Sequence, residues 1–406
     1  MHRYMHLLSK LVFVMCSLIA VYVTLLTISY CIPDEFLKEA VDDGKEVMSV
    51  EGDGPELFFN GAWACRLDNF TDTIMLQTTF RGDQSPFLAA LNNNDYARYW
   101  HGYQIFLRPM CLLRSYTNIR YVNMYIFFIV LLSSLILMKE QLGWGVSLLF
   151  LISCLSGYSF IVPMSLQFSG VYYILLFSII GVLIYYKKKK NIPYQLALHF
   201  LVIGSFTNFV DLLTFPLLTL GLPLAVICII ILEKQIKKGL LPVIIKSSIS
   251  WGIGYGVTWI SKWILATVFL KKNIIGDAIE NAKFRSFGDT GGGPLNRTYM
   301  FITNIKNIMP AQSIKIGLCV LLVIVLIWLV LVIRAHKSFN NIKKAFPILI
   351  LAVMPYVWFM IMANHSQMHY WFTYRIQMIS VFILFYFLFY CVDISKLTGR
   401  VYQSNQ

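Results

Sequence analysis

Long apolar runs separated by short polar segments make up most of the 406-residue chain. A helix that crosses a lipid bilayer needs roughly 20 mainly apolar residues. We interpret the first run as a true span, because it is longer than a signal-peptide core and no A-x-A-like cleavage site follows it. The pattern predicts an all-α integral membrane protein, a single polytopic domain over residues 1–406, with about ten spans, at 8–31, 121–138, 143–162, 169–186, 194–210, 212–232, 240–270, 311–333, 346–363 and 376–391.

The polar residues between the predicted spans are distributed unevenly. The loop at 33–120 is the largest polar segment, the loop at 271–310 is the second, and the connection at 364–375 is the third of interest. With ten spans, all three lie on the same side of the membrane. The connections on the other side are only a few residues long, so we expect the protein to act on the side of the three long loops.

The distribution of charge sets the predicted orientation. The short connections, including the run KKKK at 187–190, are basic, and their only acids are Glu140, Glu233 and Asp393. The positive-inside rule therefore places these connections and both termini in the cytoplasm, and the long loops outside it.

Composition defines the class of protein and its partners. Hydrophobic residues form 58% of the chain and charged residues 13%, and the mean hydropathy is +0.66, which a soluble globular protein does not have. The net charge of +14 indicates contact with anionic membrane lipids. Binding to nucleic acid is excluded, because the basic residues are dispersed over both sides of the membrane. The compact inner connections and the lack of an extensive cysteine framework favour a bacterial plasma membrane.

The stretch NNNDYARYWHGYQIFLRPM at residues 92–110 is too polar to cross a membrane and unusually aromatic. Asparagines followed by Asp95 form a helix-start signal, and the aromatic residues after it recur at helical spacing. Arg98, His101 and Arg108 fall on another face of that helix. We predict an amphipathic helix near 95–110 that lies in the extracytoplasmic interface. The cations either anchor the helix or hold the phosphate of a lipid-linked substrate.

Acidic residues in the first long loop are candidates for a general base. Asp68 and Asp72, in RLDNFTDTIML, are spaced to share one helix face, and Asp34 and Glu35 follow the first span directly. A carboxylate of this kind can take the proton from an acceptor hydroxyl. The alternative for Asp72 is a role at a helix start or on the surface.

Ionisable groups also lie near the outer ends of predicted spans at three further sites, namely Asp211, Lys262 and the connection at 364–375. Asp211, in the predicted turn between two spans, either faces a cavity or lies at headgroup level. Lys262 stands between two tryptophans and either neutralises a phosphate or anchors the interface.

The segment NHSQMHYWFTYR contains His365, His369 and Arg375. It is not the zinc motif H-E-x-x-H, because Ser366 stands where that motif has glutamate. The two histidines could bind a phosphate oxygen or a divalent cation such as Mg or Mn, or they could be polar ends of an aromatic belt.

The layout of one span, a long outer loop with acids near its start, a surface helix and many further spans resembles that of the GT-C glycosyltransferases. The segments LDNFTD, YWHGYQIFLRP, TNFVDLLTFPLLTLG and HYWFTYR are also similar to membrane proteins of bacterial surface-polysaccharide loci. The resemblance implies an inverting transferase that moves a sugar from a polyprenyl-phosphate-linked donor to a cell-surface glycan or glycolipid. It further implies that no nucleotide sugar is used directly and that a metal is dispensable.

Under this resemblance, Asp72 or Asp68 is the base, with Asp34 and Glu35 as the alternative pair. The remaining site residues would surround the lipid phosphate and the sugar, namely Arg98, His101, Arg108, Asp211, Lys262, His365, His369 and Arg375.

Two other functions fit the same sequence. A transporter or flippase of lipid-linked saccharides would have charges along a path through the membrane. The spans contain few ionisable groups, and apart from His199 and Lys246 these lie at the outer end, which weighs against transport. A polysaccharide polymerase or ligase would act at the same face on the same carrier, and the sequence does not separate it from a transferase.

Overall fold

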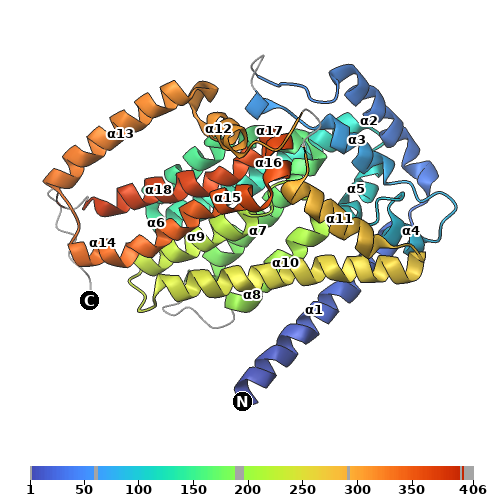
Figure 1. Ribbon diagram of the computed structural model, residues 1–406, viewed down its shortest axis with the longest axis horizontal. Helices are drawn as coiled ribbons and strands as arrows, with labels where there is room; N and C mark the ends of the chain where they lie inside the picture. Colours follow the sequence, from blue (N-terminus) through green and yellow to red (C-terminus); the bar gives the residue numbers. More distant parts are fainter. Residues whose placement is uncertain (1, 59–62, 188–195, 290–292, 394–395, 397–406) are drawn as a thin grey trace.

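The computed structural model describes residues 2–58, 63–187, 196–289, 293–393 and 396, and these form an all-helical protein (Figure 1). The lysines at 188–190 and the glycines at 291 and 292 lie outside the described residues. Within the described part of the chain, pairing of β type is limited to two isolated bridges.

Among the described residues, seven helical segments are long and apolar enough to cross a membrane, which confirms the prediction of an all-α membrane protein. Three further apolar segments are shorter, namely α8 (Leu196–Val210), α9 (Leu218–Glu233) and Gln104–Leu113. The seven are Ser9–Ser29 within α1 (His2–Ser29), α6 (Tyr116–Ser156), α7 (Leu166–Tyr186), α10 (Leu240–Leu270), α13 (Ile314–Arg334), Phe339–Ile361 with α14 (Phe339–Ala345) and α15 (Leu349–Ile361), and Tyr370–Cys391 with α17 (Tyr370–Thr373) and α18 (Met378–Cys391).

Helix α6 folds back on itself at Gly143. The backbone of Gly143 has φ 87° and ψ 167°, a conformation that interrupts the helix and that glycine adopts most readily. The hydroxyl of Ser147 donates to the carbonyl of Leu135 at 2.9 Å. In a straight helix, residues twelve positions apart lie about 18 Å apart along the axis. The two halves therefore lie side by side. The first contains the predicted run at 121–138, and the second covers part of the run at 143–162, which extends past the end of α6 at Ser156.

The centre of the bundle is α9, and its periphery is α13. Every residue of α9 from Leu218 to Leu232 is buried, and α7, α8, α10 and α18 all pack against it. A helix that is apolar on all sides is stable in this central position. By contrast, Gly317 is the one buried residue of α13, which lies at the margin of the molecule (Figure 1). The indole nitrogen of Trp328 donates to the carbonyl of Leu388 at 2.9 Å, which connects α13 to the bundle.

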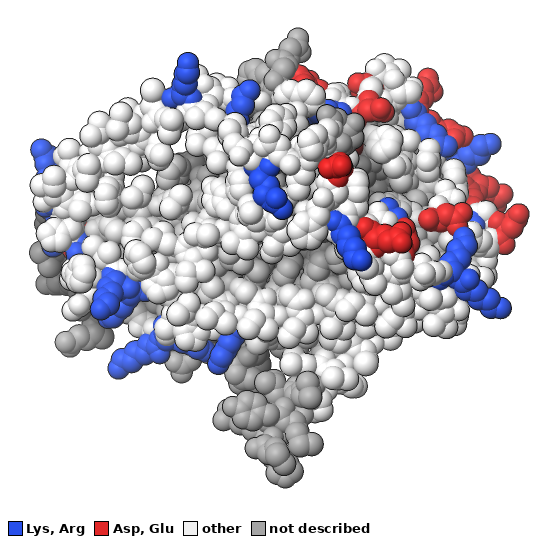
Figure 2. All heavy atoms as spheres, viewed as in Figure 1, with Lys and Arg blue, Asp and Glu red and all other residues white. Residues whose placement is uncertain are grey.

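The three long loops meet at one end of the bundle. They contribute short helices, α2 (Lys38–Glu51), α3 (Asn69–Gln77), α4 (Pro86–Asn92), α5 (Gln104–Met110), α11 (Ile274–Phe287), α12 (Arg297–Ile308) and α16 (Ala363–Met368). Arg98 pairs with Asp277 of α11, and Asn364 of α16 donates to the carbonyl of Gly288. On the face drawn in Figure 2, most acidic side chains gather at the end that carries α2 and α11.

The predicted interfacial helix near 95–110 is wrong in extent and in environment. Helix α5 begins only at Gln104, and Asp95 and His101 have positive φ values that break a helix. The segment is buried: Trp100 is 1% exposed, and its indole nitrogen donates to the carbonyl of Thr258 at 2.7 Å. Because the aromatic side chains pack between α1, α8 and α10, tertiary contacts override the local helical pattern.

Candidate functional site

Asp72, the predicted base, is fully buried on α3 against the start of α7. Its carboxylate accepts hydrogen bonds from the backbone amides of Leu166 and Gln167, both at 2.9 Å, and from the hydroxyl of Ser165 at 3.1 Å. The first amides of a helix have no partner within it, so Asp72 caps α7 from a distant helix. Burial raises the pKa of Asp72 to about 7, although the hydrogen bonds from the two amides lower it. The structure thus gives Asp72 a capping role, and its predicted role as a base stays a prediction.

Asp68 caps its own helix. Its carboxylate accepts from the amide of Thr71 at 3.2 Å and from the Thr71 hydroxyl at 3.0 Å, and α3 begins at the next residue. The two acids do not share a helix face as predicted, because Asp68 precedes the helix. Burial raises the pKa of Asp68. Both acids of the preferred pair thus cap helices, Asp68 its own helix and Asp72 the start of α7.

Lys262, predicted to neutralise a phosphate, is fully buried and occupied by the end of α4. Its ammonium donates to the carbonyls of Ala90 and Leu91, at 3.2 and 2.8 Å, and to the side-chain oxygen of Asn93 at 3.0 Å. A cation is favourable there, because the last carbonyls of a helix are unpaired and carry partial negative charge. An ammonium has three donors, so none is left for a phosphate.

Two of the predicted arginines also bind backbone carbonyls. Arg108 is buried, donates through Nε to the carbonyl of Ser29 at 2.8 Å, and bonds the carbonyl of Ile32, which follows α1. Arg375 is buried, donates to the carbonyl of Gly157 after α6 at 3.1 Å, and reaches two further carbonyls with its other nitrogens. Both arginines therefore stabilise the ends of helices, which contradicts their predicted contact with a phosphate.

His101 and Arg98 also have protein partners. Nδ1 of His101 lies 2.7 Å from the hydroxyl of Tyr103, and Nε2 lies 2.9 Å from the carbonyl of Tyr96. Burial lowers the pKa of His101 to about 3, so the ring is neutral. A neutral ring lacks the positive charge with which His101 was predicted to bind a phosphate. Arg98 is partly exposed and pairs with Asp277 at 3.1 Å.

The structure brings His365 and His369 together around an arginine that sequence reasoning missed. Nη1 of Arg285, on α11, lies 2.8 Å from Nε2 of His369 and 3.4 Å from Nδ1 of His365. Burial and the charge of Arg285 lower the pKa of His369 to about 3, and burial is also the largest cause that lowers the pKa of His365. Two neutral imidazoles therefore hold one guanidinium at the meeting point of the long loops. The one signal for Arg285 in the sequence was its place in a loop on the same side as the histidines.

Unpartnered polar atoms surround this arginine–histidine cluster, by which we mean Arg285, His365 and His369. Because Arg285 donates to Nε2 of His369, the proton of that ring lies on Nδ1. Nδ1 of His369, the hydroxyl of Ser366 and the indole nitrogen of Trp371 are all buried, and none has a hydrogen-bond partner in the described part of the chain. Buried donors are rarely left unpaired, so the cluster has the composition of a site for an oxygen-rich group.

Asp211 and Tyr99 adjoin the arginine–histidine cluster. The ring of His365 faces the backbone of Leu213 in the turn between α8 and α9, and the carboxylate of Asp211 accepts from the amide of Thr214 in the same turn. Tyr99 is buried, and the charges of Arg285 and Asp211 both act on its hydroxyl. Asp211 is therefore the one acid of the predicted set that lies near the cluster.

The arginine–histidine cluster does not suit a divalent cation. The positive guanidinium of Arg285 occupies the position between the two imidazoles where a metal would have to sit. Within the described residues, no three His, Cys, Asp or Glu side chains are grouped as metal ligands. The chemistry of these donors favours an anion.

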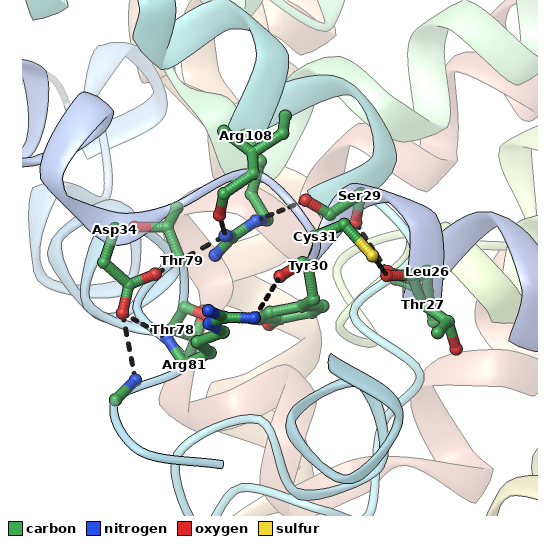
Figure 3. Close-up of polar contacts among 12 residues, drawn as sticks. Leu26, Thr27, Ser29, Tyr30, Cys31, Asp34, Thr78, Thr79, Arg81 and Arg108 are labelled. Atoms are coloured by element: carbon green, nitrogen blue, oxygen red, sulfur yellow. Dashed lines mark hydrogen bonds and ion pairs between the residues drawn. The ribbon is translucent and has the colours of Figure 1, made fainter. Parts of the chain in front are cut away.

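The alternative acid, Asp34, lies beside Arg81 and Arg108 (Figure 3). One oxygen of Asp34 accepts from the backbone amides of Arg81 and Gly82, both at 3.0 Å, and the other lies 3.5 Å from the buried Arg108. Its side chain is 26% exposed. Asp34 thus ties the chain after the first span to the turn that follows α3.

Comparison with protein-family models, with curated proteins and with solved structures finds no match.

Proposed function

We propose that this protein is a membrane glycosyltransferase of GT-C type that moves a sugar from a polyprenyl-phosphate-linked donor to a cell-surface glycan or glycolipid. The observation that carries the proposal is the arginine–histidine cluster with its unpartnered buried donors, at the meeting point of the three long loops. In this proposal the chain crosses a bacterial plasma membrane ten times, because the second half of α6, α8 and α9 add three crossings to the seven long apolar segments. Both termini are then cytoplasmic.

The arginine–histidine cluster suits the phosphate of the donor. Guanidinium and N–H donors match phosphate oxygens in geometry and charge, and Arg285 supplies both. When the bond between the sugar and the phosphate breaks, negative charge develops on the departing polyprenyl phosphate. Donors already oriented in a site that excludes water stabilise that charge more in the transition state than in the ground state. His369 and Trp371 provide such donors without a competing partner.

The base in this proposal is Asp211. It takes the proton of the acceptor hydroxyl while the acceptor oxygen bonds the anomeric carbon and the polyprenyl phosphate departs, which inverts the configuration. Burial raises the pKa of Asp211 to about 6, which brings it close to the value that suits a general base near neutral pH. Hydrogen bonding does not separate Asp211 from the helix caps Asp68 and Asp72, because its carboxylate also accepts from the amide and the hydroxyl of Thr214. Asp211 is preferred for its place beside the cluster, and Asp34, which is partly exposed, is the second choice.

The test compares a deletion of the gene with complementation by wild type, Arg285→Gln and Asp211→Asn at equal protein level. Lys283→Gln is the matched control, because Lys283 is exposed on the same helix as Arg285. We expect both site variants to lose one sugar from the surface polysaccharide while the lipid-linked donor accumulates on the outer leaflet. Lys283→Gln should restore the polysaccharide. Normal polysaccharide with Arg285→Gln would disprove the role of the cluster.

The same experiment separates the alternatives. A transporter or flippase would leave the lipid-linked precursor on the inner leaflet of the deletion strain. A polymerase or ligase would leave the sugar composition unchanged and alter the chain length or the attachment of the glycan. Transfer that survives treatment with a chelator would support a reaction without a metal.

A further inference from the structure

A polar cleft opens in the first long loop. It consists of two adjoining hollows of about 580 and 250 Å³, which share Gln77 and Asn94. Binding sites for small molecules commonly have volumes of about 300 to 1,000 Å³. The hollows are lined by Lys45, Gln77, Phe80, Arg81, Gly82, Asp83, Gln84, Ala89 and Asn94, and by Ile74, Gln77, Thr78, Asn94 and Tyr96.

The amide side chains of this cleft are available to a ligand. Gln77, at the end of α3, and Asn94, after α4, are exposed, and neither side chain has a hydrogen bond within the described residues. Each amide offers two donors and one acceptor oxygen, which is the combination that sugar hydroxyls require. Phe80 and Tyr96 add aromatic surface at opposite ends of the cleft. An aromatic face packs against the apolar C–H face of a sugar ring.

The charged side chains of the cleft favour a ligand with a negative group. Lys45 and Arg81 line the larger hollow together with a single acid, Asp83, so the local charge is positive. Among the described residues Lys45 has two weak partners, the carboxylate of Asp42 at 3.9 Å and the ring of Phe80, whose centroid lies 5.9 Å from the ammonium. Its ammonium can therefore turn toward a bound carboxylate without breaking a strong ion pair.

We propose that this cleft binds an acidic saccharide, a sugar unit bearing a carboxylate or phosphate. The role of the cleft as the acceptor site rests on the proposed function. It adds to that function the chemical class of the acceptor. Binding itself does not depend on transfer.

Asp34 positions one wall of the cleft. The two amides that it accepts from, those of Arg81 and Gly82, belong to the turn that lines the larger hollow (Figure 3). Gly82 has φ 58°, a left-handed conformation that few other residues adopt cheaply. The carboxylate of Asp34 thus helps to hold the turn by binding both of its amides. Asp34 is a positioning residue in this inference.

The experiment measures binding to the full-length protein in lipid nanodiscs by calorimetry. The probes are cellobiouronic acid, whose second sugar is glucuronic acid, and neutral cellobiose, which differ in one carboxylate. We expect wild type to bind the acidic probe about tenfold more tightly than the neutral one, the equivalent of roughly 1.4 kcal/mol. Sugar phosphates compete in a second titration, which distinguishes a carboxylate from a phosphate as the preferred group.

Three variants test the assignment. Lys45→Gln should abolish the preference for the acidic probe and leave cellobiose binding unchanged, and Gln77→Ala should weaken both probes several-fold. Lys38→Gln, at an exposed lysine two turns earlier on α2, is the matched control and should bind like wild type. Equal affinity of wild type for the two probes, no saturable binding of either, or the same loss with Lys38→Gln would overturn the inference. Arg285→Gln should bind both probes normally, so retained transfer by this variant together with intact binding counts against the proposed function alone.

Discussion

The strongest prediction concerns Asp72, because its two interpretations lead to opposite results. As a catalytic base, Asp72 could be replaced without loss of folded protein. As the cap of α7, it supports the first turn of a buried helix through three hydrogen bonds, to Ser165, Leu166 and Gln167. Replacing it should therefore destabilise the protein.

The magnitude follows from the bonds that would be lost. Asp72→Ala leaves the amides of Leu166 and Gln167 buried without a partner, at a cost of about 1 to 3 kcal/mol each. The free energy of unfolding should fall by about 4 kcal/mol in total. Asp72→Asn keeps one acceptor oxygen and should cost about half as much. Asp68→Ala removes a cap within a single helix and should cost only about 1 kcal/mol.

The assay is unfolding of the purified protein in detergent by titration with SDS, followed by tryptophan fluorescence. Transfer activity of the same preparations is measured beside it. We expect the order of stability to be wild type, Asp68→Ala, Asp72→Asn and Asp72→Ala. An Asp72→Ala protein that unfolds like wild type and yet transfers no sugar would refute the capping argument and restore Asp72 as the base.

Three further predictions follow from the same structure. Lys262→Met leaves the last carbonyls of α4 without their cation and should lower the free energy of unfolding by about 3 kcal/mol, whereas Lys271→Met, at an exposed lysine, should leave it unchanged in the same SDS titration. The folded-state pKa of His369 is lowered to about 3 from 6.5, so its stability contribution is complete above pH 6.5 and is lost as the pH falls toward 3. His369 alone should therefore contribute about 2 kcal/mol to the loss of stability between pH 7 and 5, and His369→Gln should reduce that loss by the same amount, as measured by unfolding at both values. Arg285→Lys keeps the charge but cannot donate in a planar fork, so the transfer rate should fall at least about tenfold, and a wild-type rate would contradict the phosphate role.

The membrane segments could be predicted from the sequence because hydropathy is a property of each local stretch. A run of about 20 apolar residues is a helix in a bilayer whatever its neighbours are, since its backbone must be hydrogen bonded internally. The turn at Gly143 follows the same logic, as the two apolar runs on either side of it were separable in the sequence. The grouping of the long loops at one end, with their acidic residues, is a consequence of alternating spans.

The tertiary structure alone decided what each charged residue does. Asp72, Lys262 and Arg375 each find a helix end that lies far away in the chain, and nothing in their spacing indicates such a partner. The stretch at 92–110 has the periodicity of a surface helix, yet it is buried and largely irregular because its aromatic side chains find better contacts inside. Residue spacing reports local geometry. The roles of buried charges depend on which backbone groups lack a partner, and packing determines that.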